Sequence, residues 1–360
     1  MKRLAIIAIT LCLGVAPSAL GQTSWPNQRE ADFILRNFRF GSGETLAELR
    51  IHYITLGNAR KNAAGEIVNG ILLLHGTSGS STSWLQPTLA NELFAGGQPL
   101  DASRYFVIIP DGIGAGGSSK PSDGLRGGFP HYRYRDMVDA HYRLVTEGLG
   151  IRHLRLVLGT SMGGMQTWMW GEMYPDFMDG LVPIASQPSA MSGRNWLTRR
   201  VRIEAIRNDP DWNGGNYDKN PTRYVYTLPL ASLMTESVVR IQETAPTREA
   251  ADALYQRLVE EAKKNDANNQ LYAIEAVMDY DPSEDLHKIR ARLLAINFAD
   301  DALNPPELGV LEPAIAKIPH ARYVMLPAGP DTHGHYTYFR AAMWKVHLAE
   351  FMNTLEATRE

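Results

Sequence analysis

The fold is decided by residues 154–164, which read LRLVLGTSMGG. An apolar run from Leu154 to Leu158 leads into a G-x-S-x-G pattern, which is typical of a sharp turn between a strand and a helix. The glycines allow the strand and the helix to pack closely while the serine backbone is strained. Residues 165–174 then predict a helix that ends before Pro175. The stretch therefore predicts that Ser161 is an exposed nucleophile in an enzyme that makes and breaks acyl bonds.

Other short apolar runs surround this turn and are separated by helical segments. Such alternation predicts an α/β fold with crossover connections and a mainly parallel sheet. Helices are expected over 134–149 and 338–355. The remaining strands are expected over 49–56, at the edge of the sheet, and over 70–75, 105–110, 181–185, 292–297 and 321–326.

Residues 186–288 interrupt the alternation and are mostly helical. One helix would suffice to join two strands, so we expect a helical cap inserted after the sixth strand and lying over the active site. The core then consists of residues 22–185 and 289–360. Helices are expected over 194–207, 228–244, 248–264 and 268–278, with a loop over 208–221. The aromatic residues of this region are expected to pack between cap and core or, alternatively, to form an apolar wall for an acyl or aromatic group of the substrate: Trp196, Trp212, Tyr217, Tyr224 and Tyr226.

The first 21 residues have the pattern of a secretory signal peptide. Lys2 and Arg3 precede an apolar run over 4–15, and small residues occupy the cleavage positions before Gln22. The run is short for a membrane span, which needs about 20 residues. We expect a periplasmic or secreted protein with no stable membrane insertion after cleavage.

Composition excludes several classes of function. The chain has 360 residues and a net charge of −3, so it lacks the excess of basic residues that is typical of a protein with a nucleic-acid partner. Its only cysteine, Cys12, lies in the predicted signal peptide. A mature chain without cysteine has no disulfide, no thiolate nucleophile and no cysteine zinc site.

A serine nucleophile needs a histidine base and an acid that orients it, in the chain order Ser, Asp or Glu, His. Beyond the cap, Asp300 and Asp301 follow an expected strand, and His333 and His335 precede the final helix. Spacing alone leaves both members of each pair open. Asp331 with the two histidines also has the spacing of a metal site, but the serine turn explains the histidine without one. We expect no metal and no cofactor.

An oxyanion hole needs two backbone N–H groups that point at the developing negative charge. One is expected from Met162, the residue after the nucleophile. The other is expected from Thr77, in the loop after the strand over 70–75. His75 in the same loop is expected to be a structural hydrogen-bonding residue.

Several motifs together resemble the homoserine O-acetyltransferase branch of the α/β-hydrolase superfamily, over roughly residues 49–350. They are DGIGAGGSS at 111–119, YRDMV at 134–138, GTSMGGMQ at 159–166, D-P-x-W-x-G-G-x-Y at 209–217 and D-x-L-x-P-P at 301–306. The resemblance implies that Ser161 is the nucleophile, that Asp301 is the acid of the triad and that His335 is the base.

Two features depart from the acetyltransferases. In that family an aspartate after the catalytic histidine holds the substrate ammonium, whereas this chain has Tyr336. The expected export also separates the enzyme from cytoplasmic acetyl-CoA. We therefore expect an esterase-like serine hydrolase acting on a small or medium acyl compound, with an O-acyltransferase as the alternative.

The expected partner is a small-molecule acyl substrate, and the sequence is compatible with a homodimer. In the acetyltransferases an arginine binds the substrate carboxylate, and the cap offers five arginines without distinguishing among them: Arg194, Arg199, Arg200, Arg202 and Arg207.

Overall fold

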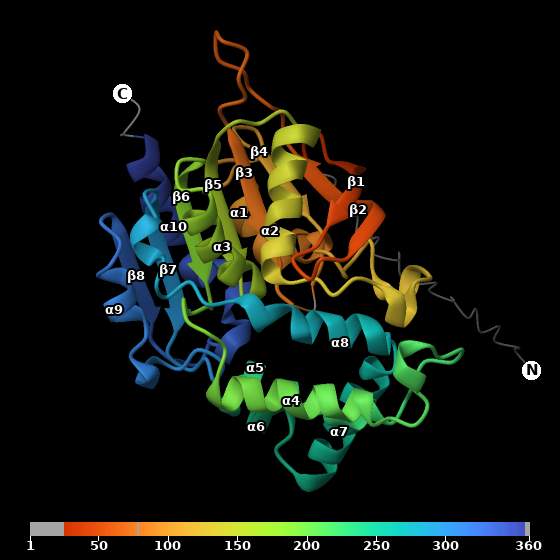
Figure 1. The fold of residues 1–360 in the computed structure, drawn as a ribbon. Helices are drawn as coiled ribbons and strands as arrows, with labels where there is room; N and C mark the ends of the chain where they lie inside the picture. The colour runs from red at the N-terminus through yellow and green to blue at the C-terminus, as the bar shows by residue number, and fades with distance from the viewer. Residues whose placement is uncertain (1–24, 78, 357–360) are drawn as a thin grey trace, which may run out of the picture.

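The computed structural model describes residues 25–77 and 79–356, so the predicted signal peptide lies outside the described residues. Within them the chain forms one eight-stranded sheet with the order β1-β2-β4-β3-β5-β6-β7-β8 (Figure 1). The β2 strand runs antiparallel to β1 and β4, and all other neighbours are parallel. The expected α/β-hydrolase sheet is confirmed. The strands are β1 Arg29–Arg39, β2 Thr45–Leu56, β3 Gly70–Leu74, β4 Phe106–Pro110, β5 Leu154–Thr160, β6 Met178–Ile184, β7 Arg292–Phe298 and β8 Ala321–Leu326.

The edge of the sheet differs from the prediction. The expected edge strand over 49–56 is the second strand, because β1 pairs with it along its length. The β1 strand has only a short apolar run over residues 33–35, and only Leu35 and Phe38 of its eleven residues are buried. A strand that contacts the core with so few residues carries a weak hydrophobic signal.

Helices cover both faces of the sheet. Alternate residues of a strand point to opposite faces, and the fully buried β3 strand serves both. Leu72 and Leu74 pack on the side of α2 and α3, whereas Ile71 and Leu73 pack on the side of α1 and α10. No helix within residues 25–77 and 79–356 is long and apolar enough to cross a membrane. The helices of the core are α1 Pro87–Leu93, α2 Tyr134–Arg143, α3 Met162–Met173, α9 Leu311–Ile315 and α10 Ala341–Glu356.

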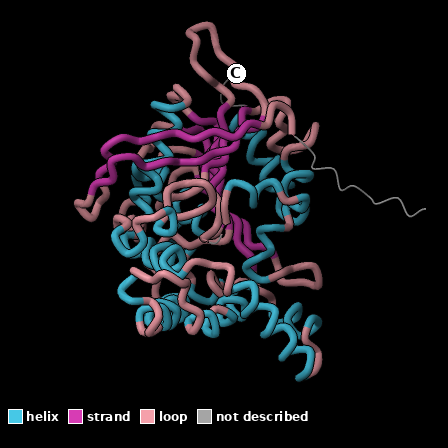
Figure 2. Tube along the Cα trace, turned by 90° about the vertical axis from the view of Figure 1, so that its right-hand side faces the viewer, coloured by secondary structure: helices cyan, strands magenta, loops and turns pink. Residues whose placement is uncertain are grey.

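Residues 186–288, which we call the cap, lie between β6 and β7 in the chain and below the sheet in Figure 1. The lower part of the molecule in Figure 2 accordingly shows helices and loops. The two ends of the cap are joined, because the Tyr280 hydroxyl donates a hydrogen bond of 2.8 Å to the carbonyl of Gln187. The cap helices are α4 Gly193–Arg207, α5 Pro229–Thr235, α6 Val238–Thr244, α7 Arg248–Ala262 and α8 Ala267–Glu275.

One predicted cap helix is wrong. The sequence predicts a continuous helix over 228–244, but the structure has α5 and α6 separated by Glu236 and Ser237. Both residues are extended, with ψ of 151° and 139°. The Glu236 carboxylate accepts a hydrogen bond of 2.9 Å from the Ser237 N–H, which stabilises the break. A side chain that binds a nearby backbone N–H group competes with the helical hydrogen bonds, and the spacing of apolar residues does not reveal such competition.

Candidate active site

Ser161 sits at the turn between β5 and α3, in a strained backbone conformation with φ of 55° and ψ of −115°. Its N–H donates a hydrogen bond of 2.9 Å to the carbonyl of Ile184 on β6, which anchors the turn. The neighbouring glycines are required by packing. A Cβ atom on Gly163 would overlap the carbonyl of Leu74, and one on Gly159 would overlap the carbonyl of Gly163. Strain of this kind persists only where the surrounding structure imposes it.

The structure brings Ser161, His335 and Asp301 into one chain of hydrogen bonds. His335 Nε2 lies 2.8 Å from Ser161 Oγ, and His335 Nδ1 lies 2.7 Å from Asp301 Oδ2. Asp301 follows the end of β7, and His335 lies in the helical turn Gly334–Phe339 before α10. Both side chains are buried, so water competes little for these bonds. A carboxylate only accepts hydrogen bonds, which assigns the imidazole proton to Nδ1 and leaves Nε2 free to accept from the serine.

The Asp301 carboxylate is surrounded by donors. Oδ1 accepts from the N–H groups of Leu303 at 2.8 Å and Asn304 at 3.2 Å. Oδ2 accepts from the Asn304 side chain at 2.9 Å as well as from His335. The same Asn304 amide donates to the carbonyl of Ala185 at 3.0 Å, which ties the acid loop to the end of β6. Sequence reasoning missed Asn304, although it lies within the D-x-L-x-P-P run.

The two rival residues lie in the same loops but serve other contacts. Asp300 Oδ2 accepts from the Thr332 hydroxyl at 2.7 Å and from the Gly334 N–H at 3.1 Å. His333 Nδ1 lies 3.3 Å from the Glu236 carboxylate of the cap. Across the described part of the chain, no group of three or more histidine, aspartate or glutamate side chains is arranged to hold a metal ion.

The two backbone segments expected at the oxyanion hole adjoin Ser161. Met162 is the first residue of α3, where the N–H is not used within the helix. Thr77 follows Gly76, which lies so close to Ser161 that a Cβ atom added to this glycine would be 3.4 Å from the Ser161 Cβ atom. This loop is held by His75, which donates from Nδ1 to the Gly76 carbonyl at 2.7 Å and accepts from the Gly112 N–H at 2.8 Å. Burial lowers the pKa of His75, which keeps the imidazole neutral in this structural role.

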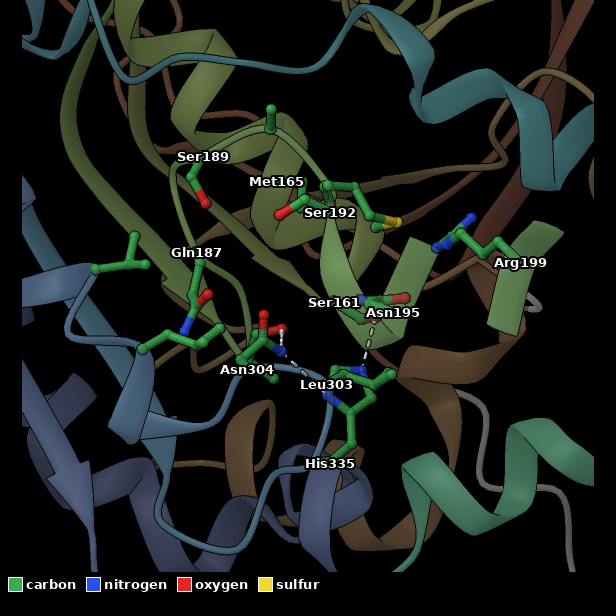
Figure 3. Close-up of a pocket in the computed structure, with 15 residues that line it drawn as sticks. Ser161, Met165, Gln187, Ser189, Ser192, Asn195, Arg199, Leu303, Asn304 and His335 are labelled. Carbon is green, nitrogen blue, oxygen red and sulfur yellow. Dashed lines mark hydrogen bonds between the residues drawn. The ribbon is translucent and has the colours of Figure 1, made fainter. Parts of the chain in front are cut away.

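A cavity of about 220 Å³ opens on Ser161 and His335 between the core and the cap (Figure 3). Arg199 extends toward it from α4 and is the only permanently charged side chain among the described residues that line it. The other walls come from Ser161, Met165, Ala185, Gln187, Ser189, Ala190, Met191, Ser192, Asn195, Leu303, Asn304, Leu308, Val310 and His335.

Arg199 and Arg202 lie one turn apart on α4 and have no carboxylate partner among the described residues. Arg199 donates to the carbonyl of Ile274 at 3.2 Å, and Arg202 donates to the Gln270 side chain at 2.9 Å. Burial, together with the charge of Arg199, lowers the pKa of Arg202 to about 10. Arg199 therefore gives the cavity a positive charge on its cap side, and Arg202 lies behind it without lining the cavity.

Comparison with known proteins identifies the family. The alpha/beta hydrolase fold family matches residues 69–334. A probable acyltransferase of Methanothermobacter thermautotrophicus is 31% identical over 81% of this chain and 89% of its own length. A homoserine O-acetyltransferase of Chloroherpeton thalassium is 31% identical over 82% of this chain and 81% of its own length. The acetyl esterase MekB shares the fold, with a TM-score of 0.78 and 24% identity over 90% of this chain and 97% of the esterase. The chain is thus an enzyme of the α/β-hydrolase superfamily and belongs to its homoserine O-acetyltransferase-like branch.

Proposed function

We propose that this enzyme is an exported serine hydrolase that cleaves a carboxylic ester or a related acyl compound. The observation that carries the proposal is the chain of hydrogen bonds from Ser161 through His335 to Asp301. A serine hydroxyl is a weak nucleophile unless an adjacent base takes its proton. His335 Nε2 is within reach of that proton, and Asp301 holds the ring in the required tautomer.

In the proposed reaction Ser161 Oγ attacks the substrate carbonyl while its proton passes to His335 Nε2. The tetrahedral oxyanion is stabilised by the N–H groups of Met162 and Thr77. His335 then returns the proton to the leaving alcohol, and the acyl-enzyme forms. Water attacks this acyl group with His335 again as the base, which releases the carboxylic acid and restores Ser161.

Two features support water over an alcohol as the acyl acceptor. Tyr336 stands where the acetyltransferases have the aspartate that holds the substrate ammonium. The N-terminal pattern over 1–21 favours export, away from cytoplasmic acetyl-CoA. The alternative, an O-acyltransferase of the homoserine O-acetyltransferase type, is supported by the sequence relatives of that activity.

The proposed substrate is small or medium in size and carries a negative charge. A cavity of about 220 Å³ favours short acyl groups over long-chain lipids. Of the five cap arginines considered from the sequence, Arg199 is the one that lines this cavity. A guanidinium without a carboxylate partner is well suited to bind a carboxylate of the substrate.

The test is a panel of p-nitrophenyl esters from acetate to palmitate, assayed on the mature protein with Ser161→Ala as the control. We expect the highest kcat/KM at short chain lengths and none in the variant. Addition of homoserine distinguishes the two functions, because an acyltransferase consumes the ester faster when its acceptor is present. Peak activity on palmitate, or acceleration by homoserine, contradicts the proposal.

Export is tested separately by N-terminal sequencing of protein recovered outside the cytoplasm. The mature chain is expected to begin at or near Gln22. Recovery of a cytoplasmic product that retains residues 1–21 contradicts this part of the proposal and restores acyl-CoA as a donor.

A further inference from the structure

The loop that carries His335 is fixed from the core by Asp300. Its carboxylate accepts hydrogen bonds from Thr332 and Gly334, which lie on the N-terminal side of His335. Thr332 is 2% exposed and Asp300 is half-buried, so water has limited access to these bonds. Asp300 and Asp301 are consecutive, and the end of β7 therefore anchors both the imidazole and the loop behind it.

The opposite side of this loop rests on the cap. We call Glu236 and Ser237, which join α5 to α6, the α5–α6 turn. Gly334 has a φ of 57°, and a Cβ atom there would lie 2.9 Å from the Ser237 nitrogen and 3.0 Å from the Glu236 carbonyl carbon. The two backbones are thus in direct contact at the residue next to His335. A side chain at position 334 would push the turn and the loop apart.

A polar chain crosses the same contact through His333. Arg340 lies 3.2 Å from His333 Nε2, and a guanidinium can only donate. His333 Nε2 therefore accepts, and the proton of the neutral ring is on Nδ1, which faces Glu236 Oε1 at 3.3 Å. Arg240 on α6 adds a hydrogen bond to the carbonyl of Pro330 at the start of the loop.

We infer that Glu236 is a positioning residue that acts through His333 and Gly334 to hold His335 against Ser161. The inference rests on the proposed function of Ser161 and His335. The helix break at Glu236 allows this contact, because a continuous helix over 228–244 would not present its backbone to Gly334. Any movement of the cap away from the core breaks the Glu236–His333 contact and releases one side of the loop. The position of the proposed base is thereby coupled to the seating of the cap.

The test compares Glu236→Ala with Glu236→Gln in the full mature protein. Glu261→Ala is the matched control, because Glu261 is a cap carboxylate on α7 that pairs with Lys264. We expect Glu236→Ala to lower kcat roughly 10- to 100-fold with KM nearly unchanged, since displacement of a catalytic group by about 1 Å has effects of this size. Glu236→Gln keeps an oxygen acceptor for His333 and Ser237 and is expected to recover most of the rate. Glu261→Ala is expected to match the wild type.

A second readout is independent of the substrate. The His335 Nδ1 proton is hydrogen-bonded to the Asp301 carboxylate, so we expect its resonance downfield of the amide region in proton NMR spectra. The resonance is assigned by its loss in His335→Ala. We expect this resonance to shift or broaden in Glu236→Ala and to stay in place in Glu261→Ala. If the alanine variant does not fold, Glu236→Asp, which withdraws the carboxylate by one methylene, is measured instead.

The outcomes separate the inference from the proposed function. If no ester is hydrolysed but the resonance moves in Glu236→Ala, the positioning role stands and the proposed function fails. If esters are hydrolysed but Glu236→Ala behaves like Glu261→Ala in kcat and in the resonance, the positioning role is wrong. A loss of kcat with an unmoved resonance also overturns it.

Discussion

Replacement of Asp301 by asparagine would reverse the polarity of one hydrogen bond in the triad. The new amide must place its oxygen and its NH₂ group among donors on both sides. Two backbone N–H groups, from Leu303 and Asn304, point at the Oδ1 position. Leaving both donors unsatisfied would cost about 1–3 kcal/mol each. The oxygen therefore stays there, and the NH₂ group turns toward His335.

This orientation forces His335 into the wrong tautomer. An NH₂ group at the Oδ2 position makes Nδ1 an acceptor, so the ring proton moves to Nε2, which lies 2.8 Å from Ser161 Oγ. A protonated Nε2 donates to the serine and cannot take its proton. We expect kcat/KM to fall on the order of 10³-fold or more, the size seen when a triad acid is lost. That corresponds to about 4 kcal/mol of transition-state stabilisation.

The adjacent Asp300→Asn substitution is the control. It removes the same charge one residue away, but its partners are Thr332 and Gly334, and an amide oxygen can still accept from both. We expect it to retain most of the activity. The assay is kcat/KM on p-nitrophenyl acetate, with the thermal midpoint of each variant to show that it is folded. Comparable losses in the two variants, or a larger loss in Asp300→Asn, would refute the tautomer argument.

Three further predictions concern other parts of the molecule. A fluorophosphonate should label the mature chain once, at Ser161, and labelling that persists in Ser161→Ala would contradict its assignment as the nucleophile. Arg199→Ala should lower kcat/KM roughly tenfold or more on a succinate half-ester, from the loss of a charged hydrogen bond, and little on methyl butyrate. Arg200→Ala, which removes a solvent-exposed pair with Glu204, should affect neither ester, and equal effects of both substitutions would exclude Arg199 from recognition of the carboxylate. Burial lowers the pKa of His141 to about 4, below its unfolded value of about 6.5, so the unfolded chain binds a proton in this window that the folded chain does not. The free energy of unfolding should therefore fall as the pH drops from about 6.5 to about 4, by up to about 1.4 kcal/mol per pH unit. Urea denaturation should show a shallower pH slope for His141→Gln, and an unchanged slope would contradict the prediction.

The sequence predicts the central part of the fold well because the signals there are local. The fully buried β5 strand is visible in the sequence as an apolar run. The turn at Ser161 requires glycines for packing, and these are visible in the sequence as the G-x-S-x-G pattern. The β1 strand was missed because most of its side chains face solvent. The break between α5 and α6 was missed because helical periodicity reveals neither the hydrogen bond between Glu236 and Ser237 nor the contact with Gly334, about a hundred residues along the chain.

The sequence predicts which loops carry the residues of the site better than it predicts the contacts that these residues make. The order of serine, acid and histidine along the chain predicts the loops, but consecutive aspartates and alternate histidines have equivalent spacing. To choose between these residues, one must know the direction of each side chain. In the structure Asp301 contacts His335, whereas Asp300 points toward Thr332. Asn304 was missed for the same reason, since only the folded loop directs its amide toward the Asp301 carboxylate.

The bond between Tyr280 and Gln187 joins the start of the cap to a residue near its end, and we expect residues 188–279 to be exchangeable for this reason. A segment whose ends meet can be replaced by another of different length without a change in the order of the strands, because the flanking chain leaves and re-enters at one place. The triad and the oxyanion loop lie outside this segment, whereas Arg199 lies within it. Grafting of residues 188–279 between relatives should therefore transfer the choice of substrate and leave the chemistry in place, provided that the graft keeps the contact of Glu236 with His333. We expect relatives that share the triad loops to differ in substrate mainly through the residues that this segment presents to the cavity, Arg199 among them.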